Sequence, residues 1–227
     1  MADFELQRKN MVESQVRPSD ITDRRIMRAM QALPRERFAG DASRVLAYMD
    51  QDLPVSPAQA GARPGAQQRA LLAPRVLARL LQLLEIEAGD RVLEIGSATG
   101  YGAAVMSQMA KRVIALESDE GLAASARANV AALSIDNVTI VSGPFSAGWA
   151  AEAPYAAILL AGAVPEIPAA LLDQLQDGGR LAAVIASGGI GQIMQYRRFG
   201  ASYASRRVTE AGARALPGFE RTPGFVF

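Results

Sequence analysis

The chain has 227 residues, of which 50% are apolar and 21% are charged. These values are typical of a globular protein with one α/β domain, and they exclude disordered, collagen-like and coiled-coil classes. The 24 basic residues nearly balance the 23 acidic ones, so the overall charge gives no drive toward nucleic acid or acidic lipid.

The chain contains neither Cys nor His. This excludes disulfides, thiolate nucleophiles, His-based triads and metal sites with Cys or His ligands. No calcium-loop pattern is present, and we expect no metal site. The polar N-terminus lacks the regions of a signal peptide, and no apolar run is long enough to span a membrane. We therefore expect a cytoplasmic protein that does not bind membranes.

Two helices and a long loop are predicted before residue 74. Residues 4–16 form a polar helix, and a second, amphipathic helix ends at Pro34. This pair either packs on a larger domain or contacts a substrate. Residues 52–69 contain three prolines and two glycines that break regular structure, which predicts a loop that is either a functional lid or a disordered segment.

From Pro74 onward, strands alternate with helices. After a helix that starts at Pro74, we expect strands at residues 91–95, 112–117, 138–142, 156–160 and 180–186. The helices between them cover residues 101–110, 119–133 and 168–175, and Gly178-Gly179 is a turn. This order predicts an α/β fold with a mostly parallel sheet. Residues 194–199 and 203–208 add an antiparallel pair, and residues 218–227 add a final strand or a packing tail. We divide the chain into an N-terminal extension, residues 1–73, and a ligand-binding domain, residues 74–227.

A glycine loop follows the first of these strands. Residues 92–101 read Val-Leu-Glu-Ile-Gly-Ser-Ala-Thr-Gly-Tyr, and Glu117 ends the next strand, 21 residues after Gly96. Such a loop lets backbone amides approach a ligand, and the acid can accept hydrogen bonds from two ribose hydroxyls. The loop lacks the third small residue of the dinucleotide fingerprint. Its Glu-x-Gly-x-x-x-Gly pattern is that of S-adenosylmethionine (SAM) methyltransferases; the alternatives are a ligand-free loop and a nicotinamide site.

Further segments identify a family. Residues 33–38 read Leu-Pro-Arg-Glu-Arg-Phe, residues 47–50 Ala-Tyr-Met-Asp and residues 53–55 Leu-Pro-Val; residues 23–30, 152–155, 163–175 and 178–181 also match. Over nearly its full length the chain resembles the protein-L-isoaspartate (D-aspartate) O-methyltransferase family. The resemblance implies a Rossmann-like class I methyltransferase fold. It also implies transfer of the SAM methyl to the free α-carboxylate of an isoaspartyl residue in a damaged protein, which leaves S-adenosylhomocysteine (SAH). The ester then forms a succinimide that reopens partly to aspartate.

The resemblance also implies where ligands bind. The expected cofactor-binding residues are Gly96, Ser97, Ala98, Gly100, Tyr101, Glu117, Ser118, Gly143 and Phe145. The expected substrate-binding residues are Arg69, Leu72, Ala161, Gly162 and Ala163. No catalytic residue is assigned, because a carboxylate acceptor is ionised at neutral pH and needs no general base.

The chain departs from the family pattern at this site. The family has Gly-Gln-Thr-x-Ser-x-Pro, and alignment on Pro74 puts Ala70 at the Thr position and Leu72 at the Ser position. Pro144 replaces an Asp that contacts adenine, and Ala156 replaces the Asp of a Tyr-Asp pair. Because Ala and Leu donate no hydrogen bond, we expect weak or absent isoaspartyl methylation, with Arg69 as the nearest group for a substrate carboxylate. The alternatives are a different methyl acceptor and a SAM-binding protein without turnover.

The C-terminal region is rich in arginine. Six Arg and two Glu lie between residues 196 and 221. They either contact nucleic acid or form the solvated faces of the antiparallel strands. Because no aromatic–basic module accompanies them, we expect no nucleic-acid binding.

Overall fold

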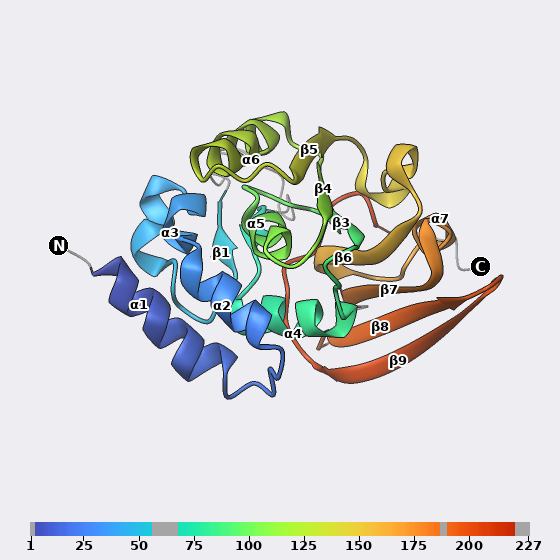
Figure 1. The fold of residues 1–227 in the computed structure, drawn as a ribbon, viewed down its shortest axis with the longest axis horizontal. Coiled ribbons are helices and arrows are strands. Elements are labelled where there is room, and N and C mark those ends of the chain that lie inside the picture. Colours follow the sequence, from blue (N-terminus) through green and yellow to red (C-terminus); the bar gives the residue numbers. More distant parts are fainter. Residues whose placement is uncertain (1–2, 56–67, 187–189, 221–227) are drawn as a thin grey trace, which may run out of the picture.

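A seven-stranded sheet forms the centre of the molecule (Figure 1). The computed structural model describes residues 3–55, 68–186 and 190–220. The strand order is β5-β4-β3-β6-β7-β8-β9, parallel from β5 to β7 and antiparallel from β7 to β9. The strands are β3 Arg91–Ile95, β4 Arg112–Glu117, β5 Val138–Ser142, β6 Tyr155–Val164, β7 Leu175–Ile185, β8 Gln192–Phe199 and β9 Ser202–Glu210. The predicted fold class, a mostly parallel sheet with antiparallel C-terminal strands, is confirmed.

The inner parallel strands β3, β4 and β6 are buried on both faces, whereas the edge strand β5 is half-buried. Side chains on the two faces of the sheet belong to two different apolar clusters. Val92 and Val113 belong to one cluster, and Leu93 and Ile114 belong to the other. Their short apolar runs fit this environment, because a strand covered on both sides needs no polar face. The order of strands reverses between β3 and β6, since β4 and β5 lie on one side of β3 and β6 lies on the other. In open α/β sheets this point, at the carboxyl ends of the strands, is where ligands bind.

Four helices in the described part of the chain connect or flank the strands of the sheet. They are α4 Pro74–Leu84, α5 Tyr101–Ser107, α6 Glu120–Ala132 and α7 Ala169–Leu172. Pro74 occupies the first helical turn of α4, where its missing N–H costs nothing. The carboxylate of Asp119 accepts a hydrogen bond from the backbone N–H of Leu122 at 2.9 Å and so caps α6. The predicted helices are therefore present, with ends that differ by a few residues.

The N-terminal segment packs on the sheet domain. It contains α1 Phe4–Met11, continued by a π-helical segment Val12–Val16, then α2 Arg24–Ala32, α3 Arg35–Phe38 and a 3-10 helix Asp41–Leu46. Met11, Ile26 and Met30 belong to the same apolar cluster as Leu80 of α4. The structure thus favours packing over substrate contact for the first two helices. The division of the chain at residues 73 and 74 stays a prediction.

Two sequence-based expectations need correction. The loop predicted for residues 52–69 contains strand β1, Leu53–Pro54, which pairs with β2, Ala70–Leu71; residues 56–67 lie outside the described part. The helix predicted to reach residue 175 ends at Leu172, and β7 begins at residue 175, so Gly178-Gly179 lies inside a strand. Of the two alternatives for residues 218–227, the described residues 218–220 form no strand, and buried Phe219 joins an apolar cluster, which favours the packing tail. In the two corrected cases, pairing with a distant strand overrides the local signal.

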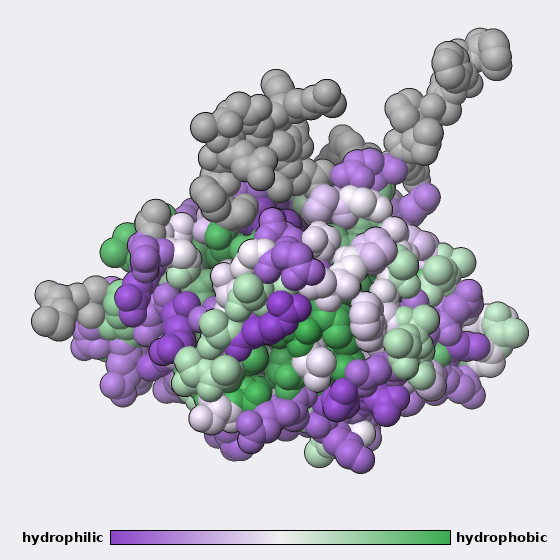
Figure 2. Space-filling model, turned by 90° about the horizontal axis from the view of Figure 1, so that it is seen from above, coloured by the Kyte–Doolittle hydropathy of each residue, from purple (hydrophilic) through white to green (hydrophobic). Residues whose placement is uncertain are grey.

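Apolar side chains lie mostly inside the molecule. On the face seen in Figure 2, hydrophilic side chains occupy most of the margin and apolar ones lie near the centre. Within residues 3–55, 68–186 and 190–220, no helix combines the length and apolar character that crossing a membrane requires. The same residues contain no group of three or more Asp or Glu arranged to hold a metal ion.

Candidate functional site

The glycine loop connects β3 to α5 with three residues in the left-handed region. The φ angles are +87° at Gly96, +51° at Ala98 and +93° at Gly100. The backbone N–H groups of Gly96 and Ser97 donate to the carbonyl of Leu116 at 2.9 and 3.1 Å, which fixes the loop to the end of β4. Glycine has no Cβ and adopts such angles freely, so the sequence dictates this sharp turn. The loop lies at the carboxyl ends of β3 and β4, as predicted.

Glu117 ends β4 beside this loop and is fully buried. Its Oε2 accepts a hydrogen bond from the N–H of Ala98 at 2.7 Å, and its Oε1 accepts from the N–H groups of Ser118 and Asp119 at 2.9 and 3.2 Å. A buried carboxylate needs such donors to remain charged. The glycine loop, Glu117 and Ser118 are therefore one connected unit, as the spacing of 21 residues indicated.

The side chain of Arg69, the residue before β2, also contacts this unit. Its Nη2 lies 2.8 Å from Oε2 of Glu117, and the pair is buried, with exposed side-chain fractions of 8% and 0%. The guanidinium also lies 5.1 Å from the ring centroid of Phe145, at a distance typical of a cation–π contact. Sequence reasoning placed Arg69 near a substrate carboxylate. In the structure its partner is the carboxylate expected to hold the ribose.

Three of the expected substrate residues, Ala161, Gly162 and Ala163, lie in β6, next to the C-terminal segment. The N–H of Ala163 donates to the carbonyl of Arg214, and the N–H of Leu216 donates to the carbonyl of Ala163, both at 2.8 Å. A Cβ added to Gly162 would lie 2.7 Å from Cγ of Leu216, so the glycine permits this close contact. Sequence reasoning missed Leu216, because no local pattern indicates that it meets a strand some fifty positions earlier.

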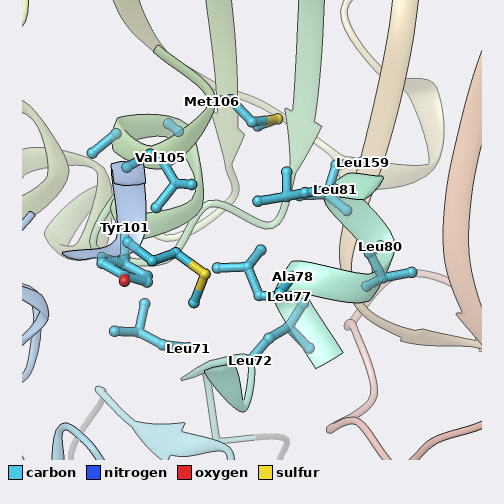
Figure 3. Close-up of a cluster of buried hydrophobic side chains, with 14 of the residues drawn as sticks. Leu71, Leu72, Leu77, Ala78, Leu80, Leu81, Tyr101, Val105, Met106 and Leu159 are labelled. Atoms are coloured by element: carbon cyan, nitrogen blue, oxygen red, sulfur yellow. The ribbon is translucent and has the colours of Figure 1, made fainter. Parts of the chain in front are cut away.

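Ala70 and Leu72 face the glycine loop across a small cavity of about 10 Å³, about the volume of one water. The cavity is also lined by Ala161, Gly96, Ser97 and Ala98. Figure 3 shows Leu71 and Leu72 beside Leu77 of α4 and Tyr101 of α5. Ala70 and Leu72, the positions to which the family resemblance assigns hydroxyls, thus lie beside the glycine loop, and their side chains are apolar.

Tyr101 and Gly143 make different contacts near the loop. The Tyr101 ring is buried, packs edge-on against Phe38 and lies 4.7 Å beneath the guanidinium of Arg35. The N–H of Gly143 donates to the carbonyl of Glu117 at 3.2 Å. The structure thus brings every residue of the predicted cofactor set to the loop or next to it, and Tyr101 contributes chiefly to the core.

Glu94, in the middle of β3, is a second buried carboxylate. It is 1% exposed, and its Oε1 would lie 1.9 Å from a Cβ added to Gly102, so only glycine fits opposite it. Among the described residues, no group lies within hydrogen-bond distance of its Oε2. Burial raises the pKa of Glu94 from 4.5 to about 8, although a hydrogen bond from the backbone of Ala103 partly opposes the shift. Glu94 is the Glu of the Glu-x-Gly-x-x-x-Gly pattern, although sequence reasoning did not include it among the site residues.

This shift predicts a pH dependence of stability. In the unfolded chain Glu94 loses its proton near pH 4.5, and in the folded protein near pH 8, so the folded state loses stability as pH rises between these values. Glu94→Gln removes this titration. We expect the free energy of unfolding of the variant, relative to the native protein, to increase from pH 5 to pH 8 in urea titrations. The exposed Glu120→Gln serves as the control, and an equal difference at both pH values would contradict the prediction.

Comparisons with known proteins identify the family. The family model of protein-L-isoaspartate(D-aspartate) O-methyltransferase matches residues 6–212. A protein-L-isoaspartate O-methyltransferase of Koribacter versatilis is 36% identical over 81% of this chain and 78% of its own length. That of Herpetosiphon aurantiacus is 33% identical over 97% of this chain and 95% of its own length.

Solved structures agree in fold. A protein-L-isoaspartate O-methyltransferase with 25% sequence identity superposes with a TM-score of 0.78, over 93% of this chain and 67% of that one. A Plasmodium falciparum protein assigned to the same family and bound to SAH gives a TM-score of 0.74 at 21% identity, over 93% of this chain and 98% of that one. With a family model that spans nearly the whole chain and relatives above 30% identity, this protein belongs to the protein-L-isoaspartate (D-aspartate) O-methyltransferase family.

Proposed function

We propose that the protein is a SAM-dependent O-methyltransferase that acts on isoaspartyl carboxylates of damaged proteins, with weak turnover. Family membership supports the reaction class. The observation that carries the proposal is the position of the glycine loop beside Glu117, at the point where the strand order reverses. This is the place where α/β sheets bind nucleotide-like ligands.

The residues present fit SAM in type and position. The loop offers backbone N–H groups and glycines that allow close approach, Glu117 offers carboxylate oxygens for ribose hydroxyls, and the Phe145 ring offers an apolar face for adenine. Both oxygens of Glu117 also accept hydrogen bonds from Arg69. Glu117 can therefore accept ribose hydroxyls only when the side chain of Arg69 has moved.

When bound, SAM supplies an electrophilic methyl group on a sulfonium. The protein's own part is to orient the acceptor and to exclude water, because a carboxylate nucleophile is already ionised. Ala70, Leu72 and Ala161 give the site a dry apolar wall. This wall excludes water, but it provides no hydroxyl to orient the acceptor. An acceptor carboxylate that loses water and gains no hydrogen-bond donor is poorly stabilised and poorly oriented. We therefore expect weak turnover.

One observation also favours a second function. The wall formed by Ala70 and Leu72 is apolar, so it suits an acceptor less polar than an isoaspartyl peptide. Transfer of radiolabelled methyl from SAM to an isoaspartyl peptide distinguishes the two: measurable transfer supports the proposal. SAM binding without transfer supports another acceptor or a binding role without turnover.

The role of Glu117 is tested by replacing it with alanine. We expect Glu117→Ala to weaken SAH binding at least tenfold, about 1.4 kcal/mol, because the ribose loses its acceptor. Calorimetric titration with SAH measures the change. Glu120→Ala removes an exposed carboxylate three residues further along and should bind SAH as the native protein does. Unchanged affinity in Glu117→Ala would place the ribose elsewhere.

A further inference from the structure

Two side chains from distant segments lie directly against the glycine loop at the end of β3. A Cβ added to Gly96 would lie 2.6 Å from Cδ2 of Leu216 and 3.1 Å from Nη2 of Arg69. Leu216 is 2% exposed, and its segment is fixed to β6 by the two hydrogen bonds with Ala163.

Arg69 holds both groups that the proposed function assigns to the nucleoside. Its guanidinium pairs with Glu117, the proposed ribose acceptor, and covers the ring of Phe145, the proposed adenine contact. When the cofactor binds, the Arg69 guanidinium therefore has to leave Glu117 and Phe145, which then contact the ribose hydroxyls and the adenine ring. The Arg69 guanidinium and the ribose hydroxyls need the same oxygen atoms of Glu117, so they compete for them.

The backbone of Arg69 is fixed while its side chain has several rotatable bonds. The carbonyl of Arg69 accepts a hydrogen bond from the N–H of Val55 at 3.0 Å, and the next residue, Ala70, pairs with Pro54 in the β1–β2 ladder. Release of Glu117 therefore requires only rotation about side-chain bonds. The backbone of β2 can stay in place.

We propose that Arg69 is an internal competitor of SAM, and that the cofactor binds only to the state in which Arg69 has released Glu117. This inference rests on the proposed function. A ligand that binds one of two states shows an affinity reduced by the fraction of molecules in that state. The Arg69–Glu117 pair thus lowers the apparent affinity for SAM, and a partner that draws Arg69 away raises it.

Two variants test the competitor. Arg69→Met keeps a long side chain and removes every donor, while Glu117 retains its three backbone N–H donors. We expect Arg69→Met to bind SAH at least tenfold more tightly than the native protein, as measured by calorimetry. Arg69→Lys keeps the charge without the fork of donors and should bind SAH more tightly than native but less tightly than Arg69→Met. This variant keeps the test decisive if loss of the cation prevents folding.

The matched control is Arg112→Gln, which removes another arginine–carboxylate pair, the one with Glu152 at 2.9 Å on the surface. It should leave SAH affinity unchanged. Trp149, the single tryptophan, lies 3.6 Å from a Cβ added to Gly143 and gives a second, fluorescence readout of binding.

The outcomes separate this inference from the proposed function. Binding by Arg69→Met but not by the native protein is the strongest support for the competitor. If the native protein binds SAH and neither Arg69 variant binds more tightly, the competitor is excluded and the proposed function stands. If neither the native protein nor any variant binds SAH, both proposals are wrong.

Discussion

Replacement of Ala70 by Thr and of Leu72 by Ser is expected to raise methyl transfer to an isoaspartyl peptide by roughly one to two orders of magnitude. Both side chains line the cavity beside the glycine loop. Hydroxyls there can donate to the acceptor carboxylate, and a donor in a preorganised site contributes about 2–4 kcal/mol of transition-state stabilisation. The measurement is the initial rate with radiolabelled SAM at saturating peptide.

The backbone around these positions is held firmly, so the new hydroxyls take defined places. The carbonyl of Leu72 accepts a hydrogen bond from Arg35 at 2.8 Å, and the N–H of Ala73 donates to Asp52 at 2.9 Å. Leu72→Ser removes a buried apolar side chain, which costs about 1.5–3 kcal/mol of stability, and the assay is best run well below the melting temperature.

The control for these substitutions is Leu71→Ser. It makes the same change at the one position of the three where the family pattern has no hydroxyl, and it should give no gain. A methyl-transfer rate of the native protein equal to that of the double variant would show that the hydroxyls are dispensable. No gain in the double variant, with SAH binding intact, would point to an acceptor other than isoaspartate.

Arg35→Ala is expected to lower the free energy of unfolding by about 3–5 kcal/mol, more than any of the other substitutions proposed for this protein. The Arg35 side chain is 0% exposed. Its Nε donates to the carbonyl of Ala47 at 2.7 Å, its Nη2 donates to the carbonyl of Leu72, and it covers the ring of Tyr101. Alanine leaves two buried carbonyls without these donors and a cavity above the ring.

Urea denaturation measures this effect. Arg37→Ala, at an exposed position two residues away, removes the same kind of side chain and should change the free energy of unfolding by less than about 0.5 kcal/mol. Equal losses in the two variants would show that the buried hydrogen bonds of Arg35 contribute little. Because the free energy of unfolding of a native protein is about 5–15 kcal/mol, the expected loss is a large share of the total.

The sequence by itself determined the central part of the fold. The bounds predicted for β3, β4 and β5 agree with the structure, because each is a short apolar run between turn or helix signals. The glycine loop and Glu117 also follow from spacing alone, since consecutive parallel strands bring their carboxyl ends to one edge of the sheet. The family resemblance, carried by motifs spread along the chain, is confirmed by the comparisons.

Only the tertiary structure decided what fills the site. Arg69 and Glu117 are 48 positions apart, and Leu216 reaches Gly96 from the far end of the chain. β7 starts before Gly178 because Leu175 pairs with Tyr155 of β6, although the two glycines locally favour a turn. Local patterns report the environment of neighbouring residues, whereas contacts between distant segments depend on how the whole chain packs. The sequence therefore predicted candidate residues for the site, and the packing of distant segments determined which of them contact one another and added Leu216.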